Sequence, residues 1–554
     1  MFINDKPKWI VLALESGFDG VFVAADGTDC PYLRDCTERT ARHVKEAQEL
    51  LSGKGIEPER VKMAAICSVC GEAFSRLIND FYSRLVELGP IRVRAMGGDI
   101  SQKILERAEL VQGSFEYDVV VIGGGIAGME ASLDLAEMGF KVLLVEREPT
   151  IGGKMFLLSK VFPTLDCASC ISTPKMAAVA HHPNIDLWTY SEITRIDVKG
   201  RGDFEITILR KPRFVNEDLC TGCGTCEEVC PVILPKEYDY GLRGRKAAYI
   251  PFDTAVPKKA VIDIDKCIFC GQCERACPAS AIDFTQRPRI YRVKAHAIII
   301  ATGYRLFPAE RKVQYGYGKV PNVITAMQME RLLSPTRPFN SVLRPSDGKE
   351  PSSIGYVLCV GSRDRTVGNP RCSQVCCMYS IKQAQLILGA LPLADVTIYY
   401  MDIRAYGKGF EEFYQKAKAM GVKFVRGRVA RIEGLPNGNV RVIYEDIDEG
   451  KVKLAEHDLV VLSVGLLPNN DDILSKIHGA KIAVDELGFI VTDPSAPTQT
   501  NVEGIFAAGC ATGPKDIPDT ILEAASAAAR CAAYLRSLRQ EKVVPVEVVA
   551  NGGR

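Results

Sequence analysis

Hydrophobic positions follow two patterns along most of the chain. Short apolar runs are typical of buried strands, and segments with apolar residues three or four positions apart are typical of amphipathic helices. Residues 1–110 contain two strand-like runs, each followed by a helix-like segment. A longer alternation starts near Tyr117 with DVVVIG, a glycine turn, a helix-like segment and VLLVE. We therefore predict a small α/β domain at the start of the chain and a larger α/β fold after it.

The larger pattern is interrupted between about residues 214 and 285 by two cysteine-dense blocks. The alternation resumes at AHAIIIATGY, and a second α/β unit opens at IGYVLCVGSRD and reaches to about residue 465. The final segment reads as a strand, a loop and an alanine-rich helix. The cysteine blocks therefore look like an insertion into an otherwise regular α/β chain.

Length and charge narrow the classes of protein. The 554 residues suffice for three or four domains, and 69 Lys+Arg against 68 Asp+Glu give a net charge of +1. There is no long basic run, so we expect no nucleic-acid-binding surface. The N-terminus lacks the features of a signal peptide, and the apolar runs are too short to span a bilayer. We expect a soluble, cytoplasmic protein without a direct membrane span.

A glycine-rich turn follows the strand DVVVIG. Gly123, Gly125 and Gly128 have the spacing Gly-x-Gly-x-x-Gly, and Glu146 ends the next strand. The first glycine permits a tight turn, the second lets backbone amides approach a pyrophosphate, and the third lets the helix pack on the strand. The acid can hold a ribose hydroxyl. In this register the motif predicts a dinucleotide site rather than a purely structural turn.

Three further segments favour FAD over NAD. The segments contain Gly152, Gly153 and Lys154, then Ala301, Thr302 and Gly303, and finally Gly509 with Cys510. In this order they resemble the FAD segments of thioredoxin-reductase-like flavoproteins, which usually have Asp at the position of Cys510. The helix that starts near Pro518 is expected to aim its positive N-terminus at the flavin ring. The second unit lacks a Gly-x-Gly-x-x-Gly motif, so we do not expect direct reduction by NAD(P)H.

The chain has 20 cysteines, and eight of them form two runs of the type Cys-x-x-Cys-x-x-Cys-x-x-x-Cys-Pro. Disulfide frameworks belong to short secreted chains, and zinc ribbons separate their cysteine pairs by a longer spacer. The doubled run therefore predicts two [4Fe–4S] clusters, in which the fourth cysteine of each run ligates the other cluster. Cluster one is expected to take Cys220, Cys223, Cys226 and Cys277, and cluster two to take Cys267, Cys270, Cys273 and Cys230.

Two other groups of cysteines leave alternatives open on their spacing alone. One group either faces a metal centre or consists of buried thiols, and its members are Cys359, Cys372, Cys376 and Cys377. The other is a half-site, Cys167-x-x-Cys170, which cysteines of the N-terminal domain could complete as a metal site. A redox disulfide or structural thiols are the alternatives for this pair. The available N-terminal cysteines are Cys30, Cys36, Cys67 and Cys70.

From about Tyr117 to Arg530 the chain resembles the A-type subunits of heterodisulfide reductases, which are iron–sulfur flavoproteins. The resemblance is carried by GGGIAGMEASLDLA, FPTLDCASCISTPKM, the paired ferredoxin runs, CVGSRDRTVGNPRCSQVCCMYSIKQA, MDIRAYGKGFEEFY and AAGCATGPKDIPD. It implies that Cys359, Cys372, Cys376 and Cys377 ligate a further [4Fe–4S] cluster. It also implies that Lys382 is a neighbour of flavin N5, although a lone helical lysine is ordinarily a surface residue.

Residues 17–90 resemble a portion of the delta subunit that links a hydrogenase to heterodisulfide reductase. The family's own N-terminal cysteine motif and the second ferredoxin domain of some members are not recognisable. The fold expected from these resemblances is a thioredoxin-reductase-like α/β flavoprotein with two dinucleotide folds, an inserted two-cluster ferredoxin domain and a small N-terminal α/β domain. The expected domains are 1–110 (N-terminal, hydrogenase-delta-like), 115–213 (first FAD-binding segment), 214–290 (inserted ferredoxin), 291–350 (second FAD-binding segment), 351–470 (second nucleotide fold with a [4Fe–4S] site) and 471–554 (third FAD-binding segment with the C-terminal helix).

The resemblance implies an oxidoreductase subunit with FAD and at least three [4Fe–4S] clusters. Its expected partners are heterodisulfide reductase B- and C-like subunits, a hydrogenase- or formate-dehydrogenase-type donor, ferredoxin and a second copy of itself. Flavin-based electron bifurcation toward ferredoxin and a disulfide-type acceptor is the leading hypothesis, and it rests on the family, because spacing indicates only the cofactors. The alternative is a non-bifurcating relay subunit of a quinone-interacting or aryl-CoA-reductase complex.

Overall fold

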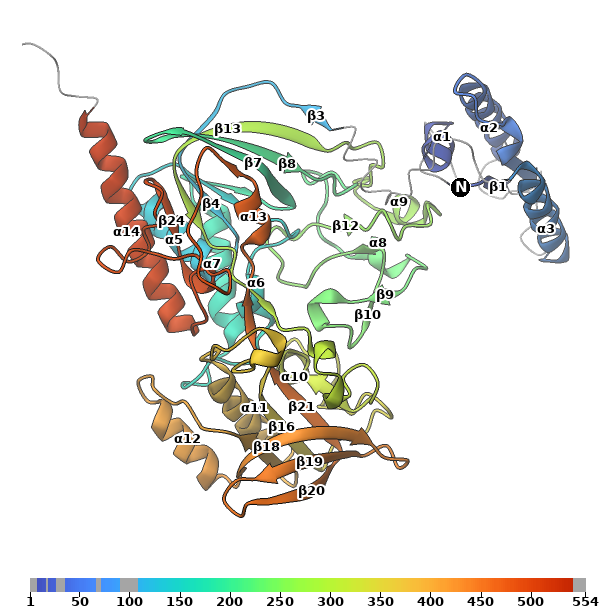
Figure 1. Ribbon diagram of the computed structural model, residues 1–554. Coiled ribbons are helices and arrows are strands. Elements are labelled where there is room, and N and C mark those ends of the chain that lie inside the picture. Colours follow the sequence, from blue (N-terminus) through green and yellow to red (C-terminus); the bar gives the residue numbers. More distant parts are fainter. Residues whose placement is uncertain (1–6, 16–17, 26–34, 66–70, 90–107, 542–554) are drawn as a thin grey trace, which may run out of the picture.

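The computed structural model describes five stretches of the chain. These are residues 7–15, 18–25, 35–65, 71–89 and 108–541. Figure 1 shows a small N-terminal unit at one side and two larger α/β domains, one above the other. Cys30, Cys67 and Cys70 fall outside the described residues, so their predicted role in a metal site stays a prediction.

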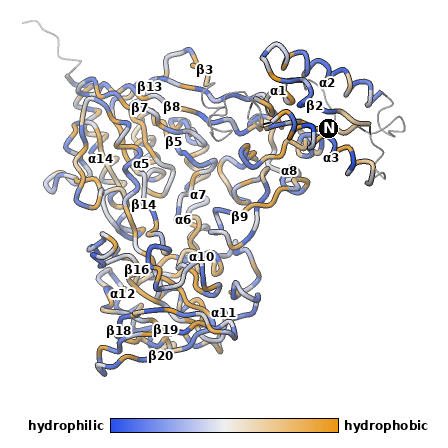
Figure 2. Tube along the Cα trace, turned by 45° about the vertical axis from the view of Figure 1, so that its right-hand side comes forward, coloured by the Kyte–Doolittle hydropathy of each residue, from blue (hydrophilic) through white to orange (hydrophobic). Residues whose placement is uncertain are grey.

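The N-terminal unit is built on two parallel strands, with Val21 opposite Val61. The helices α1 and α2 pack on these strands through a small core that includes Leu14 and Leu51. Helix α2 is coloured mainly hydrophilic in Figure 2. It is an amphipathic helix that buries one face and exposes the other. The elements are α1 (Pro7–Glu15), β1 (Val21–Ala25), α2 (Cys36–Ser52), β2 (Val61–Ala65) and α3 (Gly71–Leu88).

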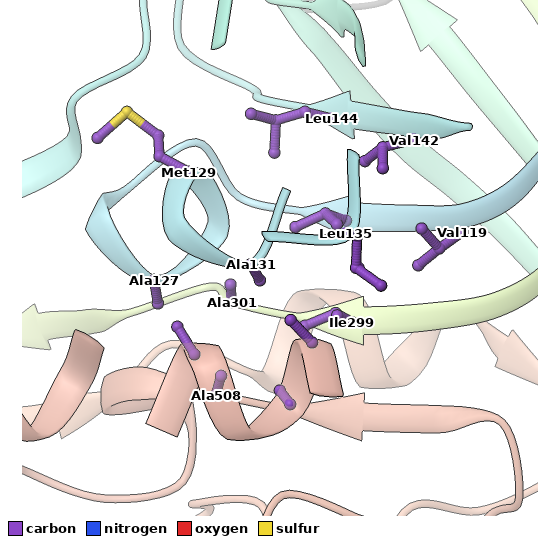
Figure 3. Close-up of a cluster of buried hydrophobic side chains, with 14 of the residues drawn as sticks. Val119, Ala127, Met129, Ala131, Leu135, Val142, Leu144, Ile299, Ala301 and Ala508 are labelled. Carbon is purple, nitrogen blue, oxygen red and sulfur yellow. The ribbon is translucent and has the colours of Figure 1, made fainter. Parts of the chain in front are cut away.

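The first domain of the main body has a nine-stranded sheet at its centre. Strands β13, β4, β5 and β6 are parallel neighbours, and β7 and β8 extend the sheet as an antiparallel pair. Figure 3 shows how small side chains such as Ala127 and Ala131 let helices and strands pack closely in this core. The elements are β3 (Glu109–Leu110), β4 (Phe115–Ile122), α5 (Ile126–Glu137), β5 (Val142–Val145), α6 (Gly153–Leu157), α7 (Ala168–His181), β6 (Ile185–Trp188), β7 (Ser191–Gly200), β8 (Asp203–Arg210), β13 (Arg289–Ile300), α13 (Asp471–Ser475), β23 (Ile477–His478), β24 (Ile505–Ala507) and α14 (Ile517–Glu541).

The insert comprises residues 211–288, between β8 and β13. Arg210 and Arg289 are paired in the sheet, so the insert leaves and re-enters the first domain at the same place. Its core contains several of the cysteines together with Phe214 and Phe284. Phe18 of the N-terminal unit lies edge-on to Phe269 of the insert, with 6.2 Å between the ring centroids. The elements are α8 (Thr225–Glu228), β9 (Leu234–Pro235), β10 (Gly244–Arg245), β11 (Ala248–Tyr249), β12 (Val261–Ile262) and α9 (Gln272–Ala276).

The second domain has a seven-stranded sheet in the order β15-β21-β16-β17-β18-β19-β20. The first five strands are parallel. β15 and α10 belong to this domain by pairing and packing, although residues 291–350 were expected to complete the FAD-binding domain. The elements are β14 (Tyr304–Leu306), β15 (Val323–Thr325), α10 (Ala326–Leu333), β16 (Ser353–Val360), α11 (Cys376–Ala390), β17 (Asp395–Tyr400), α12 (Phe410–Ala419), β18 (Lys423–Gly434), β19 (Val440–Asp446), β20 (Lys451–His457), β21 (Leu459–Val464) and β22 (Leu466–Pro468).

The two domains are joined by the antiparallel pair β14 and β22. Among the described residues, no helix has the length and apolar character that a membrane crossing requires.

Candidate functional site

A cavity of about 820 Å³ lies where the first domain, the insert and the second domain meet. Of the predicted cofactor-binding residues, its lining includes Gly123, Gly125, Glu146, Gly153, Lys154, Ala301, Thr302, Gly303, Cys510 and Pro518, together with Lys382. Residues far apart in the sequence therefore meet around one space. Gly128, Gly152 and Gly509 lie behind the lining and shape the backbone that forms it.

The glycine turn between β4 and α5 is as tight as the motif predicts. A Cβ atom on Gly128 would lie 1.8 Å from the carbonyl oxygen of Gly123, so only glycine lets the helix approach the strand here. Gly123 has a φ of +110°, which glycine adopts without strain. Gly125 precedes the first helical residue without a side-chain capping hydrogen bond. The first amides of α5 therefore face the cavity, as a pyrophosphate site requires.

Glu146 is held by backbone amides at the edge of the cavity. Its Oε2 accepts a hydrogen bond from the Gly124 amide at 2.6 Å, and its Oε1 accepts one from the Glu148 amide at 2.9 Å. Burial raises the pKa of the Glu146 carboxyl, and the two backbone hydrogen bonds oppose that shift. The carboxyl is thus fixed in place, as a ribose-binding acid needs to be.

The segment before α14 lines another part of the cavity. The Gly509 amide donates to Glu523 Oε2 at 2.7 Å, and Lys515 Nζ also contacts this carboxylate. Cys510 lies beside them, where burial raises the pKa of its thiol. Helix α14 begins at Ile517, and its first turn lines the cavity. The predicted aim of this helix at a flavin ring is therefore compatible with the structure.

Lys382 is buried rather than solvated, which is the opposite of what a lone helical lysine suggests. Its side chain is 1% exposed, and Nζ contacts Glu330 Oε1 at 2.6 Å and donates to the Lys160 carbonyl oxygen at 2.8 Å. Burial lowers the pKa of Lys382, and the neighbouring Glu330 carboxylate opposes that shift. A buried, ion-paired lysine in a cavity is a candidate functional group.

Glu330 is the residue of this site that sequence reasoning missed. Its carboxylate accepts hydrogen bonds from the Ser159 amide and hydroxyl at 2.8 and 2.6 Å, and from Gln383 Nε2 at 2.5 Å. Glu330 lies in an ordinary amphipathic helix, α10, and belongs to no motif. Only the packing of α10 against α11 reveals its role.

The two ferredoxin-type cysteine runs surround two small cavities in the insert. The structure brings the cysteines together in the expected crossed grouping. One cavity is lined by Cys220, Cys223, Cys226 and Cys277, and the other by Cys230, Cys267, Cys270 and Cys273. In the described residues no three His, Cys, Asp or Glu side chains converge on a single-ion site. Four thiols around the wall of a cavity suit the four cysteine ligands of a [4Fe–4S] cluster.

Several of these thiols are buried, and burial is the main reason why their pKa values are raised. The pKa of Cys226 rises to about 12 and that of Cys267 to about 11. Cysteine binds metal as the thiolate, so cluster binding would have to displace these protons.

The third cysteine group gathers where β16 ends and α11 begins. Burial is the main cause of a raised pKa for the Cys376 thiol, followed by the charges of Cys359, Cys377 and Cys372, so the four side chains are electrostatic neighbours. Cys376 and Cys377 open α11, and Cys359 has a φ of +58° that turns the chain at the end of β16. The structure thus brings together the four cysteines that the resemblance assigned to a further cluster.

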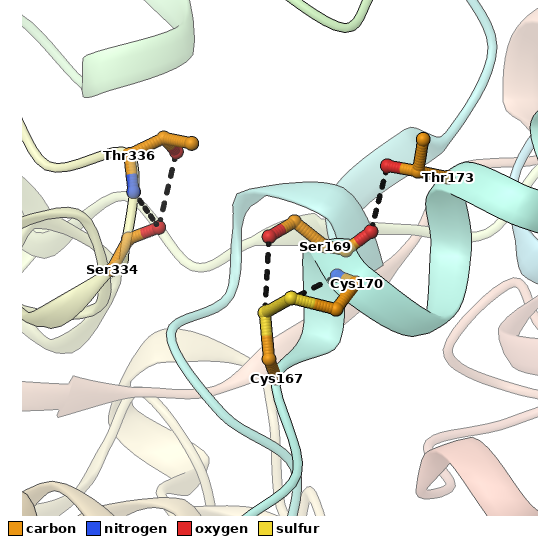
Figure 4. Close-up of a disulfide and its surroundings, with 6 residues drawn as sticks. All are labelled: Cys167, Ser169, Cys170, Thr173, Ser334 and Thr336. Atoms are coloured by element: carbon orange, nitrogen blue, oxygen red, sulfur yellow. Dashed lines mark hydrogen bonds between the residues drawn. A yellow bond between two sulfur atoms is a disulfide. The ribbon is translucent and has the colours of Figure 1, made fainter.

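Cys167 and Cys170 form a disulfide in the structure, one of the alternatives that the sequence left open. Figure 4 shows the pair at the start of α7, with Cys167 Sγ accepting from the Cys170 amide at 3.2 Å. The N-terminal unit lies beside the insert, away from α7, in both overall views. A metal site shared by this pair and the N-terminal cysteines stays a prediction.

The end of β16, where an NAD site would lie, is filled by protein. A Cβ on Gly361 would lie 2.1 Å from the ring of Phe307. Asp364, in the loop that follows β16, forms an ion pair with Lys312 Nζ at 2.6 Å. The expectation that NAD(P)H does not reduce the protein directly stays a prediction.

Four family models match the chain. The methyl-viologen-reducing hydrogenase delta subunit matches residues 5–89, and the FAD-dependent oxidoreductase family matches residues 118–161. The 4Fe–4S dicluster domain matches residues 219–282, and the pyridine nucleotide-disulphide oxidoreductase family matches residues 262–532. These matches confirm the predicted fold class, the oxidoreductase class, FAD and the ferredoxin-type [4Fe–4S] clusters.

Relatives match over most of the chain. The A-type subunit of the H(2):CoB-CoM heterodisulfide,ferredoxin reductase of Methanothermobacter marburgensis is 46% identical over 78% of this chain and 66% of that protein. The A-type subunit of the H(2)/formate:CoB-CoM heterodisulfide,ferredoxin reductase of Methanococcus maripaludis is 47% identical over 82% of this chain and 68% of that protein. Among solved structures, thioredoxin reductase from T. acidophilum is 17% identical, with a TM-score of 0.44 over 76% of this chain and 99% of that chain. The chain spans about two thirds of the length of the relatives it matches.

Proposed function

Because the chain belongs to the family of A-type heterodisulfide reductase subunits, we propose that it is the flavin-containing electron-transfer subunit of a heterodisulfide-reductase-like complex. It receives electron pairs from a hydrogenase- or formate-dehydrogenase-type donor. It divides them between ferredoxin and a disulfide-type acceptor, which is flavin-based electron bifurcation.

The observation that carries this proposal is that both cysteine-bearing parts of the chain contribute to the wall of the large cavity. The insert contributes Tyr240 and Phe252 to its wall, and the second domain contributes Val375 and Tyr379. The ferredoxin cysteines lie in the insert, and Cys376 directly follows Val375. A cofactor in this cavity would contact both cysteine-bearing parts of the chain, which suits a device with two electron exits.

Different residues of the cavity wall suit different groups of FAD. The amides at the start of α5 bind the pyrophosphate, and Glu146 binds a ribose hydroxyl. Bound FAD supplies chemistry that takes up two electrons and passes them on singly. Lys382 holds a positive charge or a proton beside the reacting end of the cavity, and Glu330 keeps that group in place.

The partners follow from the family and from the N-terminal match. The match to a hydrogenase delta subunit supports a hydrogenase-type donor, and the names of the relatives support ferredoxin and a CoB–CoM heterodisulfide as acceptors. Subunits of the B and C type, a homodimer and a cytoplasmic location stay predictions of the sequence.

The test is a potentiometric titration of the protein purified without oxygen, read by visible absorption and electron paramagnetic resonance, with iron counted in parallel. Crossed one-electron potentials of the bound flavin are the expected result. Well-separated potentials in normal order would contradict bifurcation and favour the relay subunit of a quinone-interacting or aryl-CoA-reductase complex. Cys226→Ser and Cys376→Ser serve as matched variants that remove one cluster signal each, from the insert and from the second domain.

A further inference from the structure

Tyr379 lies between the large cavity and the third cysteine group. Tyr379 lies on the first turn of α11, two residues after Cys377, and its side chain lines the cavity. Its hydroxyl donates to the Val464 carbonyl oxygen at 3.0 Å. The Cys376 thiol is directed at the same carbonyl oxygen, at 4.0 Å. The tyrosine hydroxyl and the cysteine sulfur therefore meet at one acceptor.

The hydroxyl also lies near enough to the sulfur to influence its protonation. Burial is the main cause of the raised pKa of Cys376, and a hydrogen bond from Tyr379 opposes it. Packing keeps the ring where it is, because Tyr379 and Tyr304 lie against the buried group of Val375, Leu466 and Cys510. A group bound to Cys376 would therefore meet a fixed hydroxyl donor on its cavity side.

We propose that the Tyr379 hydroxyl donates a hydrogen bond to the Cys376 sulfur when a [4Fe–4S] cluster is bound, and that it raises the reduction potential of that cluster. The inference rests on the proposed function, because it needs the third cluster. A reduced cluster carries one more negative charge, which a hydrogen bond to a ligand sulfur stabilises. Tyr379 is a positioning residue in this role, because it acts on the cluster through the Cys376 sulfur. It changes the affinity of the cluster for an electron that leaves the cavity.

A purely structural role would have other consequences. Buried tyrosine hydroxyls usually find a hydrogen-bond partner, and Val464 alone could be that partner. Loss of the hydroxyl would then lower stability slightly and leave the cluster potential unchanged.

The experiment compares Tyr379→Phe with Tyr356→Phe in the full chain purified without oxygen. Tyr356 lies on β16 of the same domain, and within the described residues its buried hydroxyl has no hydrogen-bond partner. The midpoint potential of the third cluster is read by electron paramagnetic resonance, and Cys376→Ser identifies which signal belongs to it. We expect Tyr379→Phe to shift the equilibrium against reduction of this cluster by about tenfold, which is 59 mV for one electron. Tyr356→Phe should give the wild-type potential.

Each outcome decides something different. Equal potentials in both variants would overturn the role of Tyr379 while leaving the third cluster in place. A wild-type protein without a signal that depends on Cys376 would overturn the third cluster and, with it, this inference. If Tyr379→Phe also lost its flavin, the same titration on Tyr379→Phe with FAD restored would show whether the potential shift persists, and an unshifted potential would overturn the proposal.

Discussion

Each of the two α/β domains of the main body has its own core of parallel strands. The two domains use the corresponding edge of this core differently. In the first domain β4 ends at Ile122 and α5 begins at Ile126, so strand and helix are joined by the three glycines Gly123, Gly124 and Gly125. In the second domain residues 361–375 separate the end of β16 from the start of α11. A short glycine turn presents backbone amides to a phosphate, whereas the longer loop has room for cysteines. The length of one connection thus decides which chemistry an otherwise similar sheet presents.

Substituting one glycine in each domain tests this contrast with matched changes. Gly128→Ala places a methyl group 1.8 Å from the Gly123 carbonyl oxygen, whereas Gly389→Ala in α11 meets nothing within 4 Å. We expect Gly128→Ala to lose FAD and at least about 3 kcal/mol of unfolding free energy, because the clash is with backbone. Gly389→Ala should be neutral or stabilising by up to about 1 kcal/mol. Urea unfolding and the flavin-to-protein absorbance ratio measure both effects, and an FAD-replete Gly128→Ala protein would refute the expectation.

The Lys382–Glu330 pair ties the second domain to the first, because Lys382 also donates to the Lys160 carbonyl. Replacing one member of a buried pair leaves a charge without its partner, so Glu330→Gln should cost about 3–5 kcal/mol of unfolding free energy. The double variant Glu330→Gln/Lys382→Met should cost less than the sum of the single variants.

An exposed pair provides the control. Lys423 and Asp395 are 57% and 66% exposed, and Asp395→Asn should cost less than about 1 kcal/mol. Additive costs at Lys382 and Glu330 in urea unfolding would speak against a coupled buried pair.

The second domain should respond to acid through His457. Its imidazole is buried between Ser353 and Tyr399, with 2.9 Å to each hydroxyl, and burial lowers its pKa from 6.5 to about 4. Between these two values the unfolded chain binds more protons than the folded one, so stability is complete above pH 6.5 and is lost as the pH falls toward 4. The loss amounts to about 3 kcal/mol. Urea unfolding at several pH values should show this slope in the wild type and a weaker one in His457→Gln; equal slopes would rule it out.

The smallest expected effect concerns NADH. Phe307 fills the space at Gly361, and no helix N-terminus follows β16 directly. We therefore expect NADH to leave the flavin absorbance unchanged in the wild type and also in Phe307→Ala. Bleaching in the variant alone would show that Phe307 masks a working nucleotide site, and the two domains would then be more alike than we infer.

Local motifs of the site could be predicted from the sequence, and long-range partners could not. The glycines around Gly128 and the crossed cysteine groups follow from spacing, because a turn or a loop around a cluster is built from neighbouring residues. Lys382 was identified only through the family, and Glu330, 52 residues away, was not identified at all. Its role depends on how α10 packs against α11, and no periodic pattern encodes that contact. The same reason explains β15, whose pairing with β21 places it in the second sheet.

The insert has a consequence for how such a protein can change in evolution. Because Arg210 and Arg289 are neighbours in the sheet, the chain could gain or lose the whole insert without moving either strand. The insert nevertheless supplies a section of the cavity wall, and Phe252 stacks on Phe156 of the first domain at 3.9 Å. Excision of the insert would therefore leave β8 and β13 in place but would remove part of the cavity wall. A module attached in this way can be gained as a separable piece, but its later loss would remove a section of its host's binding site.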